Sequence, residues 1–374
     1  MIYSEFGNTG KRLSALGFGV LRMPMINNNA DIDEWQIIPM LHRAFELGVN
    51  YVDTAPPYLN SKSEAVVGKA LKGWRDKVYV STKSQSIEPG VANWMKELEK
   101  SLRKLDVDYI DFYHMWGINL DDFKTKILAK EGAMKAAIKA KNEGLIKHIS
   151  FSYHGKPEDM KEIVDTGYYE SVLMQYNLLD RKNEDNIQYC KEKGLGVAIM
   201  GPVAGGRLGA PNSVIIDLLK GKMDVKSTAE MALRFVLANP GVNIALSGMQ
   251  TIDMIEQNVR VASINNPLTE TEIQYIEKML KETQRLAELY CTGCNYCMPC
   301  PMGINIPYIF ELINYKRLYQ VADYAKHKYR KLSKEDSKSK NASVCVACGE
   351  CEQKCPQKIK VINQLKEAHT ELFF

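Results

Sequence analysis

The sequence has no long apolar run and no basic segment followed by an apolar one. It begins Met1-Ile2-Tyr3-Ser4-Glu5-Phe6-Gly7, so we expect no secretory signal peptide, and no stretch is long enough to span a bilayer. The formal net charge is only +4 at pH 7, which is too small to indicate a nucleic-acid partner by itself. We therefore expect a cytoplasmic protein that binds neither membranes nor nucleic acid.

Cysteine is almost absent from the first 290 residues, where Cys190 stands alone, and the other eight cysteines all follow. In a protein without an export signal, such a group indicates metal ligands or redox centres rather than structural disulfides. Cys190 falls in a predicted helix before Lys191 and is expected to be a packed thiol. The sulfur chemistry should therefore be confined to the last part of the chain.

Short β-rich runs alternate with longer helix-period segments, which implies right-handed crossovers and a parallel sheet. The predicted strands are Leu16–Leu21, Asn50–Asp53, Val78–Thr82, Ile110–His114, His148–Ser152, Val172–Gln175, Gly196–Met200 and Ile244–Ser247. Helical segments between them include Glu34–Leu47, Glu64–Lys72, Val91–Leu102 and Gly132–Asn142. Eight units favour closure into an α/β fold of the (β/α)8 TIM-barrel type. The alternative, an open doubly wound sheet, would want a Gly-x-Gly-x-x-Gly turn, and Gly17-Phe18-Gly19 has no third glycine following.

A TIM barrel takes about 250 residues, so a chain of 374 residues has room for a small second module. We expect the barrel at residues 1–268, a charged connecting helix at 269–290, and a ferredoxin-like, α-rich iron–sulfur domain at 291–374. Residues 1–14 precede the first barrel strand. Asn8-Thr9-Gly10 predicts the turn of a hairpin there, placed to plug the barrel floor.

Ionisable side chains end or follow three consecutive predicted strands. Asp53 and Tyr58 follow the second strand, Lys83 follows the third, and His114 ends the fourth. Taken singly, an aspartate after a strand is usually a cap, and a lone lysine is usually a solvated surface group. A histidine at a strand end is usually a polar residue whose hydrogen bonds are satisfied. Barrel enzymes place their chemistry at the carboxyl ends of the strands, so their joint occurrence predicts one site.

The stretch from Gly48 to Tyr58, with Ser63-Glu64 and Gly68 after it, resembles the signature of the aldo-keto reductases. The resemblance covers roughly residues 1–265, and it implies that Asp53, Tyr58, Lys83 and His114 are the family's catalytic tetrad. A free tyrosine, with a pKa of about 10, is a poor acid near neutrality, but a neighbouring ammonium stabilises its phenolate. We expect Lys83 to do this for Tyr58, with Asp53 orienting Lys83.

His114 is then expected to hydrogen-bond the substrate's carbonyl oxygen and to stabilise charge on it. The tetrad as a whole implies reduction of a small carbonyl compound, or oxidation of an alcohol, with Tyr58 as general acid or base. Trp116, close after His114, is either an apolar wall of the substrate pocket or a residue of ordinary loop packing.

The same resemblance implies a nicotinamide nucleotide site on the later strands. Glycines after strand seven let backbone N–H groups approach a pyrophosphate. The matching residues are Ser152 and Gln175 for the carboxamide, Met200 for ring stacking, Gly201, Val203 and Gly206 in the Gly201–Leu208 loop, Ser247, Gly248 and Met249 after strand eight, and Gln257 and Asn258 for adenine.

Three departures from the family pattern leave the nucleotide open. Tyr153 follows Ser152 where the family often has Asn, and Met200 stands where many members have an aromatic residue. No Lys or Arg lies between Gly248 and Val259 to hold a 2′-phosphate. We therefore expect either NAD(H) or NADP(H). FMN in the phosphate region after strands seven and eight is a minority alternative that no motif supports.

The eight late cysteines form two runs of four. Cys345, Cys348, Cys351 and Cys355, with Pro356 following, fit the bacterial ferredoxin pattern, whereas Cys291, Cys294, Cys297 and Cys300 have a last gap one residue shorter. In that pattern the fourth cysteine reaches the other cluster. We expect one [4Fe–4S] cluster on Cys291, Cys294, Cys297 and Cys355, and a second on Cys345, Cys348, Cys351 and Cys300. Zinc ribbons use separated Cys-x-x-Cys pairs instead.

Residues 316–340 hold nine Lys or Arg and three Asp or Glu. This composition is typical of a solvated, partly disordered linker. The alternative is a docking patch at Lys316–Lys340 for an acidic electron carrier, a ferredoxin or flavodoxin, which opposite charge would steer.

We expect an oxidoreductase whose clusters couple the barrel site to electron transfer. A hydride carries two electrons and a cluster usually passes one, so a flavin-dependent, ferredoxin-linked enzyme is one alternative. A nucleotide-binding redox sensor with a non-catalytic barrel is another. Clusters with a purely structural role, leaving an ordinary reductase, are the third.

Overall fold

The computed structural model describes residues 1–26, 31–84, 87–178, 180–206, 208, 224–264, 268–282, 291, 293–317, 322–332 and 339–374. They form two compact units, Met1–Val203 with Glu230–Leu268, and Ala204–Ala229 with Thr269–Phe374. The domain limits expected from the sequence stay a prediction, because residues 204–229 lie within the expected barrel but belong to the second unit. Within the described ranges, no helix combines the length and apolar composition of a membrane span.

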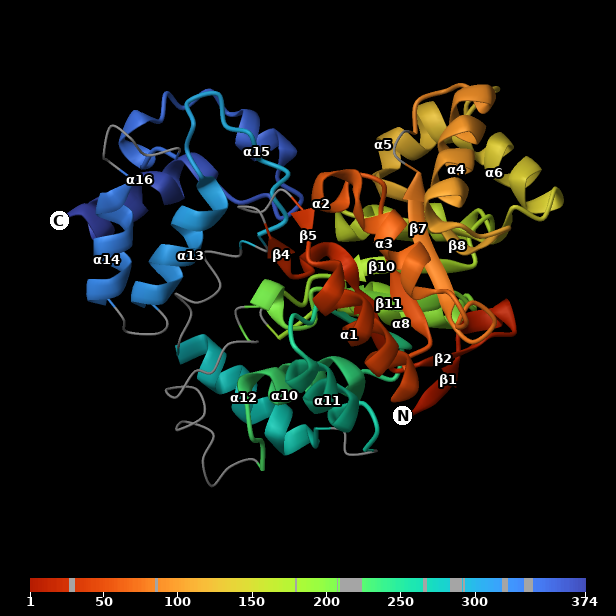
Figure 1. Cartoon of the computed structure of the whole chain (residues 1–374), viewed down its shortest axis with the longest axis horizontal. Coiled ribbons are helices and arrows are strands. Elements are labelled where there is room, and N and C mark those ends of the chain that lie inside the picture. The colour runs from red at the N-terminus through yellow and green to blue at the C-terminus, as the bar shows by residue number, and fades with distance from the viewer. Residues whose placement is uncertain are drawn as a thin grey trace. The chain divides into compact units, whose positions relative to one another are not determined.

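The first unit is built on a closed barrel of eight parallel strands (Figure 1). The strands, in chain order, are β3 (Leu16–Gly19), β6 (Tyr51–Asp53), β7 (Tyr79–Ser84), β8 (Ile110–Ile118), β9 (Ile146–Tyr153), β10 (Ser171–Gln175), β11 (Gly196–Met200) and β12 (Ile244–Ser247). Pairing of β12 with β3, at Ala245 and Leu16, and of β10 with β9 closes the ring. The predicted TIM barrel is therefore confirmed, and the open sheet is excluded.

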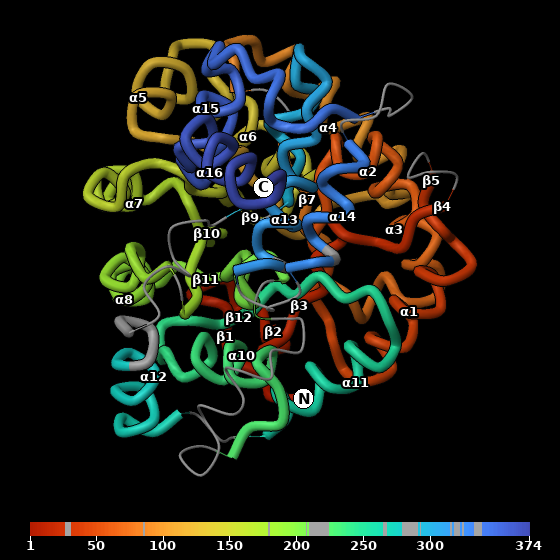
Figure 2. The backbone as a smooth tube through the Cα atoms, turned by 90° about the vertical axis from the view of Figure 1, so that its left-hand side faces the viewer, coloured from red at the N-terminus to blue at the C-terminus, as the bar shows by residue number. Residues whose placement is uncertain are grey.

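Helices follow the strands and lie outside the ring (Figure 2). They are α1 (Glu34–Glu46), α3 (Ser63–Ala70), α4 (Val91–Leu105), α6 (Ala133–Asn142), α7 (Met160–Asp165), α8 (Glu184–Glu192), α10 (Thr228–Ala238) and α11 (Ile252–Val261). In α4 the buried residues Trp94, Leu98 and Leu105 recur at helical spacing, so one face packs inward. Strand β10 is buried along its whole length, as expected for a parallel strand covered on both sides.

The floor of the barrel is filled by the predicted hairpin, formed by β1 (Tyr3–Glu5) and β2 (Arg12–Ser14). Phe6 projects from it into a buried cluster with Tyr51 and Phe112, and its ring meets that of Phe112 edge-on at 5.1 Å between centroids. Gly7, with φ of +55°, has no room for a side chain, because a Cβ would lie 2.3 Å from the Gly196 nitrogen. The hairpin thus seats directly on the amino ends of the barrel strands.

The second unit is mostly helical. Its helices are α12 (Glu270–Glu282), α13 (Ile306–Arg317), α14 (Ala322–Lys331), α15 (Glu350–Lys354) and α16 (Val361–Phe373). In α16 the buried residues Val361, Leu365, Ala368 and Leu372 form one stripe. The stripe joins a core to which Phe310 of α13 and Tyr329 of α14 contribute, and six of the late cysteines pack against this core.

The basic stretch is not a solvated linker over its described part, and that expectation is wrong there. Residues 306–317 and 322–331 are helical. Arg317 donates to the Glu371 carboxylate at 3.0 Å, and Arg330 and Lys326 donate to the carbonyls of Phe373 and Phe374 at 3.1 and 3.0 Å. Cations are favourable at the negative carboxyl end of a helix, so these residues help to hold the end of α16.

Removal of the Phe6 ring should destabilise the barrel strongly. Phe6→Ala would leave a cavity among buried aromatic residues and should lower the free energy of unfolding by about 3–5 kcal/mol. Trp35→Ala is the matched control, because Trp35 is 92% exposed and its loss should cost less than about 0.5 kcal/mol. Urea titration followed by far-ultraviolet circular dichroism measures both, and equal losses would show that Phe6 does not support the barrel.

Candidate functional site

Asp53 and Lys83 form a buried ion pair at the carboxyl ends of β6 and β7. Their exposed fractions are 5% and 2%. The Lys83 ammonium donates to both Asp53 oxygens, at 2.9 and 2.8 Å, and to the Thr54 carbonyl at 2.6 Å, and Ser81 Oγ donates to Asp53 at 2.7 Å. An ammonium has three donors, so this set occupies all of them and fixes the orientation of Lys83.

Tyr58 lies next to this ammonium. It begins the short segment α2 (Tyr58–Ser61), and its ring centroid is 5.0 Å from Lys83 Nζ. Trp116 meets the Tyr58 ring nearly at right angles, with 6.4 Å between centroids. Trp116 therefore packs against the predicted proton donor, and the ammonium is close enough to stabilise negative charge on that donor.

His114 lies directly across the sheet from Lys83, because the two residues are paired in the register of β7 and β8. Burial and the charge of Lys83 lower the pKa of His114 to about 4, against the opposing effects of Asp53 and the Phe151 backbone. Neither ring nitrogen has a partner with good hydrogen-bond geometry among the described residues. A buried polar group without a partner is costly, so this neutral imidazole is suited to a ligand oxygen.

Most of the predicted nucleotide residues gather at the same end of the barrel. Gln175 is paired with Met200 in the sheet, and Ser152 with Leu173. Ser152 Oγ accepts the Gly117 N–H at 2.8 Å, so this hydroxyl also holds the turn after Trp116. Ser247, Gly248 and Met249 end β12 or follow it, and Gly201 and Val203 follow β11. Gly206 belongs to the second unit, and Arg207 lies outside the described residues.

Both predicted adenine contacts form hydrogen bonds within the protein. Asn258, on α11, is buried and donates to Ser247 Oγ at 3.1 Å, so it braces the end of β12. Gln257 donates to Asp253 at 2.6 Å near the surface. These bonds give both residues a structural role that the sequence did not indicate.

Sequence reasoning missed a cation beside the predicted nucleotide residues that follow β12. Arg22 ends the short helix η2 (Val20–Arg22), which follows β3. A Cβ on Gly248 would lie 3.7 Å from the Cβ of Arg22. The sequence between Gly248 and Val259 gives no sign of this cation. Arg22 is distant in sequence and comes close only through the pairing of β3 with β12.

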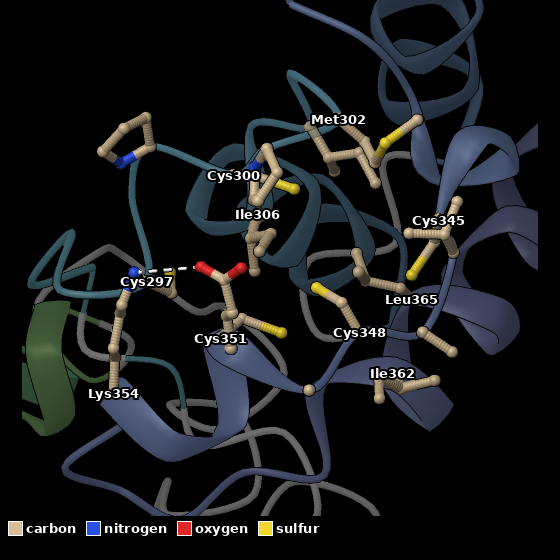
Figure 3. A pocket seen from close by; sticks show the side chains of 17 residues that line it. Cys297, Cys300, Met302, Ile306, Cys345, Cys348, Cys351, Lys354, Ile362 and Leu365 are labelled. Carbon is tan, nitrogen blue, oxygen red and sulfur yellow. Dashed lines mark hydrogen bonds and ion pairs between the residues drawn. The ribbon is translucent and has the colours of Figure 1, made fainter.

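The late cysteines line two cavities. One is lined by Cys291, Cys294, Cys297 and Cys355. The other is lined by Cys300, Cys345, Cys348 and Cys351, with Cys297 at its edge, and Figure 3 shows these four sulfurs turned toward a common space. Each set combines three cysteines of one run with the fourth of the other, which is the crossed arrangement expected from the spacing.

The cavities suit a cluster better than a single ion. A single zinc ion needs its thiolate sulfurs to converge at about 2.3 Å from one point. Among the described residues, no three His, Cys, Asp or Glu side chains converge as a single metal ion requires. Burial and the neighbouring Cys291, Cys294 and Cys355 raise the pKa of Cys297 to about 12.

Comparison with known proteins matches two successive parts of the chain. Residues 15–281 match the model of the Aldo/keto reductase family, and residues 290–359 match the 4Fe-4S dicluster domain. The first match covers more than half of the chain.

Individual relatives and a solved structure agree with the first match. The NADH-specific methylglyoxal reductase of Escherichia coli (strain K12) is 25% identical over 330 residues, 75% of this chain and 98% of that protein. L-galactose dehydrogenase of Arabidopsis thaliana is 29% identical over 279 residues, 68% of this chain and 85% of that protein. The holo form of aldo-keto reductase AKR11C1 from Bacillus halodurans has a TM-score of 0.62 at 30% identity, covering 75% of this chain and 96% of that one.

The depressed pKa of His114 predicts the acid side of the activity profile. A lowered pKa keeps the imidazole neutral above it, so a rate that needs neutral His114 should be lost only as the pH falls toward about 4. The pH dependence of kcat/KM for carbonyl reduction should therefore show no limb from His114 near the ordinary histidine value of about 6.5. A limb near that value that disappears in His114→Gln would contradict this.

Serine variants test the crossed cysteine sets. Cys355→Ser and Cys291→Ser should alter the same reduced-cluster signal in electron paramagnetic resonance, and Cys300→Ser and Cys345→Ser should alter the other. Cys190→Ser is the control and should keep about eight iron atoms per chain, as two [4Fe–4S] clusters require. If Cys355→Ser instead changed the signal that Cys345→Ser changes, each run would hold its own cluster.

Proposed function

The chain belongs to the aldo/keto reductase family and carries a 4Fe-4S dicluster domain after it, and from this premise we propose that Tyr58 transfers the proton in reducing a small carbonyl compound or oxidising an alcohol. The observation that carries the proposal is the placement of Tyr58 beside the buried ammonium of Lys83. Membership of the family makes the protein an NAD(P)-dependent oxidoreductase. The substrate and the roles of individual residues are proposals.

Each member of the tetrad has a separate role in reduction. The reduced nicotinamide, when bound, supplies a hydride to the carbonyl carbon. Tyr58 gives its phenolic proton to the oxygen, and Lys83 stabilises the phenolate that remains. Asp53 orients the Lys83 ammonium through its two hydrogen bonds. Neutral His114 donates a hydrogen bond to the oxygen as negative charge develops on it.

The nucleotide would be held by the polar and glycine residues at the barrel mouth. Ser152 and Gln175 are the proposed carboxamide partners, and Met200 the residue against the nicotinamide ring. Arg22 is placed to add positive charge near the loop after β12. Either NAD(H) or NADP(H) is compatible with this set, and one relative is named as NADH-specific.

The dicluster domain implies two clusters, and we propose that they exchange electrons with the barrel site and with an acidic carrier, a ferredoxin or flavodoxin. A hydride carries two electrons, and two one-electron clusters together hold that number. The proposed docking surface is the basic region 316–340. Some of its cations are already hydrogen-bonded to α16. We therefore propose that this region attracts an acidic carrier less strongly than its composition alone suggests.

Replacement of the Tyr58 hydroxyl tests the catalytic proposal. Tyr58→Phe should lower kcat with NADH or NADPH and methylglyoxal, the substrate in the name of one relative, by about 10²–10⁴-fold, because the proton donor is lost. The dissociation constant of the nucleotide should stay the same. Tyr3→Phe is the control, because its hydroxyl only bonds the Gly48 carbonyl at the surface. Nucleotide binding without turnover on any carbonyl, in the wild-type protein, would favour the redox sensor instead.

The same protein tests whether the barrel site exchanges electrons with the clusters. Anaerobic titration of the iron-loaded protein with NADH and NADPH should bleach the clusters and produce a reduced-cluster signal. Clusters that stay oxidised while carbonyl turnover proceeds would mean that they have a structural role or are reduced by another electron donor.

A further inference from the structure

The backbone that carries Tyr58 is unusual. Leu59, Asn60 and Ser61 have φ values of 51°, 58° and 62°, so three consecutive residues other than glycine lie in the left-handed region. Side chains of L-residues crowd the backbone there, and glycine is the usual occupant. Such a run persists only where the surrounding structure holds it, and such strain tends to occur at functional sites.

Lys104, at the carboxyl end of α4, bonds this turn from outside. Its ammonium donates to the Ser61 carbonyl at 3.2 Å and lies 3.9 Å from Glu64 Oε2. Glu64 is only 1% exposed, and its other oxygen accepts from Thr82 Oγ1 at 2.8 Å. Because Thr82 immediately precedes Lys83, this chain of contacts links the turn that carries Tyr58 to the strand that carries Lys83.

Close packing of two helices puts Lys104 in this position. Gly68 lies one helical turn after Glu64, and a Cβ on it would be 2.4 Å from the Leu105 carbonyl oxygen. The backbones of α3 and α4 therefore touch, which sets Lys104 over the start of α3. Ser63, also at that start, bonds Thr54 at 2.7 Å between their hydroxyls. The beginning of α3 is thus bonded to the residues next to both members of the buried ion pair.

We propose that Lys104 is a positioning residue for Tyr58, holding the left-handed turn so that the phenol stays beside the Lys83 ammonium. This rests on the proposed role of Tyr58 as proton donor. Lys104 acts only through the Ser61 carbonyl and Glu64. Its side chain is 38% exposed, so an alternative is an ordinary surface lysine whose pair with Glu64 has no effect on the reaction.

The test compares Lys104→Met and Lys104→Arg in the full-length, iron-loaded protein, using methylglyoxal and the preferred nucleotide. Lys104→Met should lower kcat by about tenfold or more, because small displacements of reacting groups are costly. It should leave the KM for methylglyoxal and the nucleotide dissociation constant within about threefold. The alkaline limb of kcat should move to higher pH, because the phenol leaves the ammonium that stabilises its phenolate.

Two variants separate positioning from general damage. Lys104→Arg keeps a cation of similar reach and should restore most of the rate. Lys69→Met is the matched control, because Lys69 is an exposed lysine on α3 that pairs with Glu34 at 2.7 Å, and it should behave like the wild type. A fall in kcat with an unmoved pH profile, or one that Lys104→Arg does not rescue, overturns the proposal.

Hydrogen exchange gives a readout independent of activity. Lys104→Met should speed amide exchange in the peptide covering residues 57–63, while Lys69→Met should not. Unchanged exchange there overturns the proposal. If exchange rises but kcat does not fall, Lys104 holds the turn without serving the reaction, and the proposal also fails. In that event, Tyr58→Phe shows whether the proposed function has failed too: it has if that variant is active.

Discussion

Lys83 carries its ammonium into the barrel interior, where 2% of the residue is exposed. A charge so placed needs a partner, and removal of one member of a buried pair costs about 3–5 kcal/mol. Asp53 and the Thr54 carbonyl meet this need and use every donor. The same ammonium lies beside Tyr58, and together with burial, which is the larger cause, it lowers the pKa of His114. One buried cation therefore acts on two neighbouring groups: it is close enough to stabilise negative charge on Tyr58, and it adds to the effect of burial on His114.

The parts of this arrangement that could be predicted are those set by strand ends. Buried parallel strands are short apolar runs, and the residues that follow them must meet at one edge of the barrel. For that reason Asp53, Lys83 and His114 could be grouped before any contact was known. The bonds from Ser81 and Thr54 could not be predicted, because they depend on the register of β6 and β7 and on backbone geometry rather than on residue type.

Two other features could not be predicted from the sequence, and the reason is physical. Of Leu59, Asn60 and Ser61, only Asn60 often adopts the left-handed conformation, and then as a single residue, so composition does not indicate a run of three, which tertiary contacts impose. The stretch 322–331 is rich in Lys and Arg, and composition favoured a linker. Its buried residues Ala325 and Tyr329 lie four apart, on one face of a helix. In both cases packing overrides the local preference of the chain.

The cysteine region differs, because there the spacing itself carries the geometry. In the ferredoxin pattern the first three thiols of a run bind one cluster and the last cysteine binds the other, so the spacing predicts that the two runs exchange their last cysteines. The cavities follow this rule, and both are lined by Cys297 and Ile306. They are therefore neighbours within one unit. Under the proposed electron-transfer role, two neighbouring one-electron clusters would together match the two electrons of a hydride.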